Sequence, residues 1–341
     1  MSELKISTII FIASGALSFL SAPLFSLILI PVAKRIGAID VPRDDRRMHT
    51  RPVARIGGVA VFIAFLLGAG LFLSVCRPFF TDDTALFARA IIFGGGVIIL
   101  GGLADDIYKL GPWQKMLYQA LAAVVAVSFG VRIAEGAAGV LLTLFWCVLL
   151  TNAFNLIDGL DGLCASSGAF ALLALFAASG GHELLTVLLL SATLGFLPLN
   201  LRPARLFLGD AGAMLLGFSL AVISASIFRA SPSPNTAAAI LLIFAVPLFD
   251  TAFAATRRIL KGKSPFSPDR EHLHHRLVDA GLSHGRASLL LSLLSGGFSA
   301  LGSTVATVGA SFEGLILSFL LIFPSASVIM MGKRKKRKNK F

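Results

Sequence analysis

The stretch Ala90–Lys109, AIIFGGGVIILGGLADDIYK, decides the fold of this 341-residue chain. No charged residue occurs from Ala90 to Ala104, and two adjacent carboxylates, Asp105 and Asp106, follow directly. With a few neighbouring residues at its ends, such a segment forms a helix long enough to cross a hydrocarbon core, which takes roughly 20 residues. The two carboxylates then lie where the helix leaves the membrane.

Similar apolar segments occur on both sides of this stretch. Together they predict an all-α, polytopic integral membrane protein with about 11 transmembrane helices. Two of the segments, Ala90–Ala104 and Val140–Thr151, are short and borrow neighbouring residues at their ends. In chain order the predicted spans are Ile6–Val32, Gly57–Cys76, Ala90–Ala104, Met116–Val131, Val140–Thr151, Leu163–Ser179, Leu184–Leu201, Ala211–Phe228, Thr236–Thr256, Ala287–Val308 and Phe312–Met331.

The composition agrees with a membrane protein and excludes several other classes. Hydrophobic residues make up 56% of the chain and charged residues 14%, whereas an average soluble domain has about 25% charged residues. This hydrophobicity excludes a disordered chain. The 3 cysteines lie in apolar segments without a paired short spacing, which excludes a disulfide scaffold and a zinc module.

Lysine and arginine gather on one side of the predicted spans. If the N-terminus is outside and the C-terminus cytoplasmic, 25 of the 30 Lys and Arg residues fall on the inner side. Cytoplasmic loops carry this excess of positive charge, so the bias fixes the predicted topology. The net charge of +12 is then explained by topology and by contact with membrane lipids, and we expect no nucleic-acid partner. The prediction is one transmembrane catalytic domain, 1–332, with inner loops 33–56, 104–115, 152–162, 202–210 and 257–286, followed by a basic cytoplasmic tail, 333–341.

The paired carboxylates Asp105 and Asp106 repel each other and are costly to dehydrate at a membrane boundary. A cation must compensate them, and Lys109 supplies part of that charge from the next helical turn. The pair indicates metal-linked or base chemistry. A solvated helix terminus is the alternative interpretation.

A second polar motif, TNAFNLIDGLDG, occupies Thr151–Gly162. Its Asn and Asp side chains recur every third residue, which places them on one face of a helical turn. Oxygen ligands that converge in this way, beside glycines that allow close backbone approach, suit Mg²⁺ or a sugar phosphate. A polar turn between two helices is the alternative. The residues concerned are Asn152, Asn155, Asp158, Gly159 and Asp161.

The longest inner loop carries a histidine motif, EHLHHRL, at Glu271–Leu277. Histidine can ligate zinc, but no cysteine lies near this motif in the sequence. The mixture of His and Arg is more typical of a site that binds phosphate oxygens. A basic amphipathic helix lying on anionic lipid is the alternative. The candidate residues are His272, His274, His275 and Arg276.

Two further motifs complete the inner face. The first inner loop, Asp40–Gly58, is strongly basic and ends in a glycine pair that opens a helix, a common anion-binding arrangement. The excess of positive residues in cytoplasmic loops is enough to explain the arginines of this loop. It does not explain His49 or the glycine pair. The other motif, FLGDAG at Phe207–Gly212, has a single acid, Asp210, which taken alone is best explained as a helix N-cap.

In this order the motifs resemble the polyprenyl-phosphate N-acetylhexosamine-1-phosphate transferase family. The resemblance runs from the first inner loop to the loop after the ninth span. The H-x-H-H form is similar to the branch that initiates O-antigen, enterobacterial common antigen or teichoic-acid linkage units, whereas the peptidoglycan lipid I branch has three consecutive histidines. Ala213 departs from the family, which often has Ser there. The matching motifs are D-x-P…R-x-H…P-x-x-R-x-G-G, the Asp pair, N-x-x-N-x-x-D-G-L-D-G, F-L-G-D-A-G and H-L-H-H-R-L.

The resemblance implies an enzyme of the bacterial inner membrane that uses Mg²⁺, with Mn²⁺ as the alternative ion. The implied reaction transfers N-acetylhexosamine-1-phosphate, by default GlcNAc-1-phosphate, from the UDP-sugar to undecaprenyl phosphate and releases UMP at the cytoplasmic face. A homodimer is the candidate assembly. Catalytic roles are implied for Asp105, Asp106 and Asp210, with Asp105 approaching the lipid phosphate. The implied metal ligands are Asp210, Asn155 and Asp158, and the implied substrate-binding residues are Asn152, Asp158, Gly159, Asp161, His49, Arg55, Lys109, His272, His274, His275 and Arg276.

A transporter or flippase for nucleotide-linked or lipid-linked sugars is the rival interpretation. Such a protein is expected to place polar residues near the membrane midplane and to show internal repeats. Here the centres of the predicted spans are almost free of ionisable groups, and the two halves are not similar. The main exception is Asp250, near the inner end of the ninth span, for which a structural role is the expectation.

Overall fold

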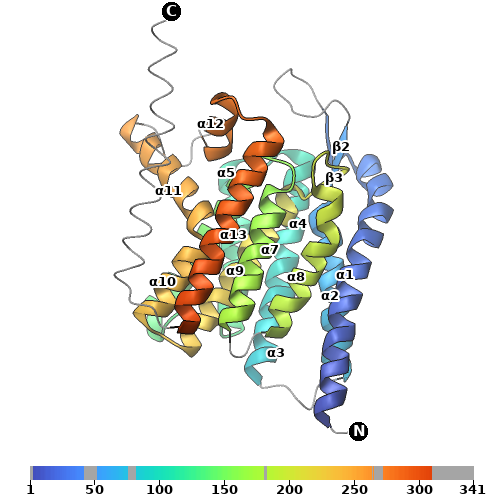
Figure 1. Ribbon diagram of the computed structural model, residues 1–341, viewed down its shortest axis with the longest axis vertical. Coiled ribbons are helices and arrows are strands. Elements are labelled where there is room, and N and C mark those ends of the chain that lie inside the picture. The colour runs from blue at the N-terminus through green and yellow to red at the C-terminus, as the bar shows by residue number, and fades with distance from the viewer. Residues whose placement is uncertain are drawn as a thin grey trace, which may run out of the picture.

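The structure, a computed structural model, describes residues 3–41, 52–75, 82–179, 183–262, 264 and 272–308. This part of the chain is mostly helical (Figure 1). A π-helical turn, Ala90–Gly94, joins α3 to α4. The helices are α1 (Glu3–Ile36), α2 (Gly57–Val75), α3 (Asp82–Arg89), α4 (Gly95–Tyr108), α5 (Pro112–Ser128), α6 (Gly136–Ile157), α7 (Leu163–Ala178), α8 (Glu183–Asn200), α9 (Gly209–Ala230), α10 (Pro234–Ile243), α11 (Ala245–Leu260), α12 (Leu273–Asp279) and α13 (His284–Val308).

The apolar segments predicted from the sequence coincide with these helices. Within the described residues, six helices are long and apolar enough to cross a membrane, or seven if the bent pair α10 and α11 is one span. Each of the first ten predicted spans overlaps a helix, and the two short ones do extend into their neighbours. The eleventh span, Phe312–Met331, and the tail 333–341 lie outside the described residues, so the count of eleven stays a prediction.

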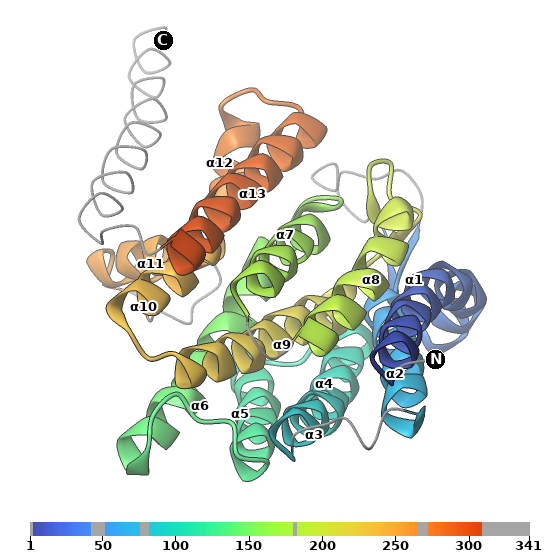
Figure 2. The same cartoon turned by 60° about the horizontal axis from the view of Figure 1, so that its bottom comes forward.

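Helix α9 forms the centre of the bundle. Figure 2 shows it surrounded by other helices, and it packs against α2, α4, α6 and α7. Apolar and small residues occur all around this helix, which is typical of a helix that is buried on every side. Because α9 begins at Gly209, its first turn brings Asp210 to the middle of one end of the molecule.

The N-terminal ends of α2 and α9 touch through glycines. A Cβ atom added to Gly58 would lie 2.1 Å from the Gly212 Cα, and the Gly58 N–H donates to the Leu208 carbonyl at 2.8 Å. A Cβ on Gly57 would meet the ring of Phe196 at 2.4 Å. The glycine pair therefore allows two helix ends to pack closely. The sequence-based interpretation of the pair as an anion site is wrong for Gly58, since its N–H already has a partner.

We expect Gly58→Ala to destabilise the protein by about 1–3 kcal/mol, because the new methyl group forces α2 away from α9. Thermal unfolding in detergent measures the effect. The matched control is Gly70→Ala in the same helix, where a Cβ would meet nothing within 4 Å. Alanine favours helix over glycine by up to about 1 kcal/mol, so the control variant should be as stable as the parent or more so. Equal stability of the two variants would contradict this packing argument.

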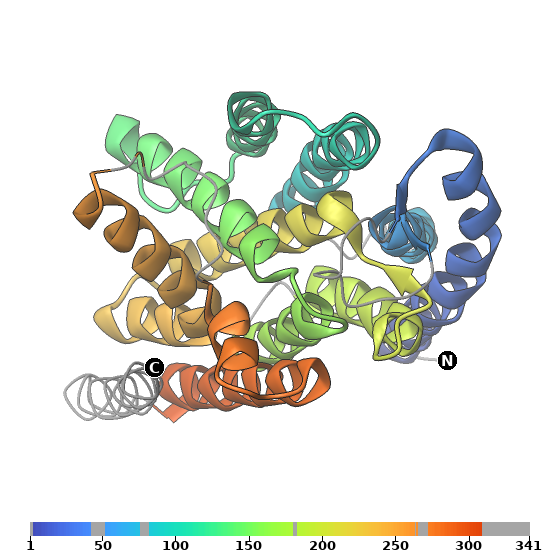
Figure 3. The same ribbon diagram turned by 90° about the horizontal axis from the view of Figure 1, so that it is seen from above.

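A small three-stranded sheet corrects the prediction that the protein is purely helical. Strand β2 (Val53–Arg55) pairs antiparallel with β1 (Ile39–Asp40) and parallel with β3 (Leu206–Phe207). Strands of two or three residues are too short to show a period of two in the sequence. The sheet and α12 lie at the same end of the bundle (Figure 1), and Figure 3 views the molecule from that end.

The predicted span over Thr236–Thr256 is not one continuous helix. The structure has two helices here, α10 and α11, bent by 79°. The break falls at Phe244, three residues before Pro247, which has no N–H to continue the hydrogen-bond ladder of the preceding helix. The bend directs α11 and its Asp250 toward the histidine motif.

Candidate active site

The small sheet brings Arg55 to the carboxylates. Arg55 lies opposite Phe207 in the parallel pair of β2 and β3, and Asp210 follows three residues later. The Arg55 Nη2 donates to the Asp210 Oδ1 at 3.0 Å, and its Nε lies 2.9 Å from the Asp106 Oδ1. Burial by itself lowers the pKa of Arg55, but Asp106 and then Asp210 raise it, so that the net shift is upward. One charged guanidinium thus joins two carboxylates from different helices.

Asp106 fixes the beginning of α9. Its two carboxylate oxygens accept hydrogen bonds from the N–H groups of Asp210, at 3.2 Å, and Ala211, at 3.3 Å. The side chain is fully buried. A carboxylate at a helix N-terminus is favoured by the unpaired N–H groups and by the helix dipole. Asp106 therefore holds α4, α9 and Arg55 together, which positions Asp210.

A tight turn between α4 and α5 returns a lysine to the Asp pair. Lys109 has a left-handed conformation, with φ of 57°, and the N–H of Leu110 donates to the Asp105 Oδ1 at 2.8 Å. Helix α5 begins at Pro112, a residue favoured in the first turn, and Gln114 accepts the Gly111 N–H at 2.7 Å. The second turn of α5 then carries Lys115 back over Asp105.

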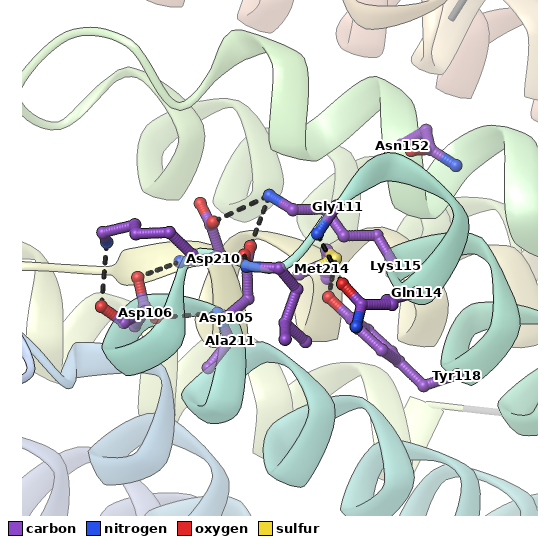
Figure 4. Close-up of polar contacts among 12 residues, drawn as sticks. Asp105, Asp106, Gly111, Gln114, Lys115, Tyr118, Asn152, Asp210, Ala211 and Met214 are labelled. Carbon is purple, nitrogen blue, oxygen red and sulfur yellow. Dashed lines mark hydrogen bonds and ion pairs between the residues drawn. The ribbon is translucent and has the colours of Figure 1, made fainter.

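Lys115 joins Asp105 to Asp210 (Figure 4). Its Nζ forms ion pairs with the Asp105 Oδ2 and, at 3.1 Å, with the Asp210 Oδ2. Asp105 is buried, while Asp210 remains partly accessible. The site thus consists of three carboxylates and two cations, Asp105, Asp106, Asp210, Arg55 and Lys115, which we call the carboxylate cluster.

Sequence reasoning missed Lys115 and expected Lys109 to supply only part of the charge that compensates the Asp pair. The Lys109 Nζ donates to the backbone carbonyl of Asp106 at 2.8 Å, whereas the ion pairs to the carboxylates come from Arg55 and Lys115. In the sequence Lys115 is one of many cations on the inner side. One signal could have identified Lys115. It lies just after Gly111-Pro112, near the start of a helix that must turn back on α4.

The Asn/Asp motif does not form the predicted single stripe. Helix α6 ends at Ile157, so only Asn152 and Asn155 lie on it, and Asp158 and Asp161 follow in turns. The Asn152 Nδ2 donates to the Gln119 Oε1 at 2.6 Å, which fixes this side chain between α5 and α6. The Asp161 Oδ2 accepts the N–H of Ala204 at 3.3 Å and so holds the loop before β3.

The middle of the motif, Asn155 and Asp158, is the part that is available to a ligand. The Oδ1 atom of Asn155 is buried and has no hydrogen-bond partner within the described residues. Burial raises the pKa of the neighbouring Asp158 to about 7, partly offset by the charge of Arg55. An unpartnered amide oxygen and a carboxyl group that is costly to ionise without a cation are both suited to a bound cation.

The histidine motif packs against the same loop. A Cβ on Gly159 would lie 2.2 Å from the His274 Nε2, so the absence of a side chain at Gly159 makes room for this ring. Burial lowers the pKa of His274 to about 3, with a smaller contribution from His275. His274 is therefore neutral at physiological pH. The Arg276 guanidinium lies 4.8 Å from the centre of the Phe253 ring.

The structure thus brings together part of the predicted site. Asp105, Asp106, Asp210 and Arg55 meet in the carboxylate cluster, and His274 meets Gly159, whereas His49 lies outside the described residues. In the part of the chain that is described, no group of three or more His, Cys, Asp and Glu side chains is arranged to hold a metal ion. Arg55 and Lys115 neutralise the carboxylates instead.

Comparison with known proteins identifies the family. The model of the family described as Glycosyl transferase family 4 matches residues 88–227. A Bacillus subtilis (strain 168) protein named as a probable undecaprenyl-phosphate N-acetylglucosaminyl 1-phosphate transferase is 36% identical over 326 residues, which cover 89% of this chain and 88% of that protein. The chain belongs to glycosyl transferase family 4. The resemblance inferred from the motifs is confirmed.

Other relatives agree with this family membership. A Mycobacterium tuberculosis (strain ATCC 25618 / H37Rv) protein named decaprenyl-phosphate N-acetylglucosaminephosphotransferase is 36% identical, covering 78% of this chain and 75% of that protein. An Escherichia coli (strain K12) undecaprenyl-phosphate alpha-N-acetylglucosaminyl 1-phosphate transferase is 29% identical, covering 83% and 81%. The family 4 match contains the Asp pair, the Asn/Asp motif and Asp210, while Arg55 and the histidine motif lie outside it.

Proposed function

We propose that this protein transfers GlcNAc-1-phosphate from UDP-GlcNAc to undecaprenyl phosphate and releases UMP. The carboxylate cluster is the observation that carries the proposal. Two cations, Arg55 and Lys115, and three carboxylates from separate parts of the chain meet at one end of the bundle. A diphosphate and a lipid phosphate repel each other, and a site of this kind provides the charges needed to bring them together.

Mg²⁺ is part of this proposal, and the chemistry of the residues fits it. Asp210, Asn155 and Asp158 would hold the ion, because they offer carboxylate oxygens and an amide oxygen that has no other partner in the described structure. When bound, Mg²⁺ screens phosphate charge and polarises the phosphorus that is attacked. Mn²⁺ takes similar oxygen ligands and is the alternative ion.

The chain's own residues orient the reactants. Arg55 and Lys115 are placed to hold phosphate oxygens, because both cations lie beside the partly accessible Asp210. His272, His275 and Arg276 extend the site toward a second phosphate. The lipid phosphate oxygen attacks the β-phosphorus of the donor, and the bond from that phosphorus to the oxygen it shares with UMP breaks, so that UMP leaves.

The proposed setting is the bacterial inner membrane. The predicted eleven spans, with the N-terminus outside and the C-terminus cytoplasmic, would put the carboxylate cluster at the cytoplasmic face, where nucleotide sugars are available. The product would begin the synthesis of a cell-surface polysaccharide. A homodimer remains the candidate assembly.

The test is UMP release by the purified protein in detergent with undecaprenyl phosphate, Mg²⁺ and a panel of UDP-N-acetylhexosamines. We expect release with UDP-GlcNAc that requires the lipid acceptor and stops when EDTA removes the ion. Release with another N-acetylhexosamine alone would change the proposed sugar. No release with any donor, together with uptake of a labelled nucleotide sugar into proteoliposomes, would replace the proposal by transport.

A further inference from the structure

Asp250 lies on α11, outside the carboxylate cluster, and contacts the histidine motif. Its Oδ2 is 2.8 Å from the Nδ1 of His272, and its Oδ1 accepts the N–H of Leu273 at 2.8 Å. Both side chains are buried, with exposed fractions of 2% for Asp250 and 7% for His272. The carboxylate therefore fixes both the histidine ring and the first residue of α12.

These contacts favour one position for the proton on the His272 ring. A carboxylate accepts hydrogen bonds, so the 2.8 Å contact favours the tautomer in which the Nδ1 of His272 donates to Asp250. The other nitrogen, Nε2, lies on the opposite edge of the ring and has no hydrogen-bond partner in the described part of the protein. His272 is thus oriented at one nitrogen and available at the other.

His272 also orders its neighbours. Its ring is stacked with that of His274, at 5.9 Å between centroids and 5° between planes. The His274 ring in turn lies 4.2 Å from that of His275 and packs on Gly159 of the Asn/Asp motif. A change at Asp250 therefore reaches the site through His272, although Asp250 itself has no contact with Asp105, Asp106 or Asp210 in the described structure.

We propose that Asp250 is a positioning residue, which holds His272 through its Nδ1–H and thereby directs Nε2, in its protonated form, to donate to a phosphate oxygen of the substrate. This inference rests on the proposed phosphosugar transfer. When Nε2 is also protonated, it donates a charge-assisted hydrogen bond to the phosphate, and the Asp250 carboxylate stabilises the imidazolium. The sequence favoured a structural role for Asp250. The geometry makes that role specific, because the residue that Asp250 holds is His272.

The first test is Asp250→Asn, which keeps the size of the side chain and its acceptor for the Leu273 N–H. The amide NH₂ then faces Nδ1 and favours the opposite tautomer, with the proton on Nε2. We expect kcat for UMP release to fall about tenfold, the lower end of the range for residues that orient a ligand. The matched control is Thr251→Val, since the Thr251 hydroxyl donates to the Pro247 carbonyl at 2.8 Å and has no hydrogen bond to the described part of the motif. Its kcat should be unchanged.

A double-mutant comparison tests whether Asp250 acts through His272. In a His272→Ala background, Asp250→Asn should cause no further loss of kcat, because the residue it positions is absent. An equal loss in both backgrounds would overturn the proposal and indicate a general packing role.

The second test uses the parent protein and does not depend on activity. Solid-state NMR of ¹⁵N-histidine-labelled protein in lipid distinguishes the two tautomers, and His272→Ala assigns the signal among the 6 histidines. We expect a proton on Nδ1, and the reverse pattern in Asp250→Asn. A neutral ring protonated on Nε2 in the parent protein would overturn the inference, even if the variant failed to fold. If the tautomer is as expected but no UDP-sugar yields UMP, the proposed function is wrong. The orientation of His272 by Asp250 is then still supported.

Discussion

Asp210→Asn is expected to lower UMP release from UDP-GlcNAc by about 10³-fold or more, which corresponds to about 4 kcal/mol of transition-state stabilisation. Asp210 is the carboxylate on which Arg55 and Lys115 converge, at 3.0 and 3.1 Å. An amide removes the negative charge that balances both cations, and it offers one oxygen where the carboxylate offers two. It also removes a proposed ligand of Mg²⁺. The rate is measured in detergent at saturating UDP-GlcNAc and lipid acceptor.

A control for this variant is available at the opposite end of the bundle. Glu135 pairs with the Arg229 Nη2 at 3.1 Å, and its side chain is 76% exposed. Exposed ion pairs contribute little, so Glu135→Gln should retain activity within twofold of the parent. Thermal unfolding of both variants separates loss of chemistry from loss of fold. More than a tenth of the parent activity in folded Asp210→Asn would contradict the role given to this carboxylate.

The helical part of the fold could be predicted from the sequence because each helix carries its own signal. Uncharged runs such as Ala90–Ala104 and Val140–Thr151 need a membrane or a buried core, and their polar ends mark where the helices stop. The family could be inferred for a similar reason. Its motifs are short, and the chemical type of each side chain is visible without knowledge of its partner.

Contacts between distant segments could not be predicted in the same way. Lys115 is one cation among many on the inner side, and only the turn at Lys109–Gly111 directs it to Asp105. The helical stripe over the Asn/Asp motif assumed that α6 continued, but glycines follow Ile157, and Gly162 has φ of 76°, which a helix does not allow. Asp250 could not be matched with His272 because Pro247 indicates a break between α10 and α11 but not the direction in which α11 then runs.

Asp105→Asn is expected to lower UMP release about 100-fold, and raising the pH from 7 to 9 should not restore it. Both oxygens of Asp105 are already used, one by the Leu110 N–H at 2.8 Å and the other by Lys115. The carboxylate therefore positions Lys115 between Asp105 and Asp210. An amide cannot attract the ammonium group in the same way, and a displacement of about 1 Å in a catalytic site can cost about 10²-fold in rate.

The pH dependence separates this role from that of a general base. A phosphate monoester has a second pKa of about 6, so most of the lipid phosphate is already dianionic at pH 7. Only about a tenth of the lipid phosphate still carries this proton, so a base that removes it can contribute far less than tenfold. If Asp105 were merely that base, its loss would stay within tenfold and the variant would recover fully at pH 9. A 100-fold loss that runs parallel to the parent profile at every pH instead assigns the effect to the lost contact with Lys115.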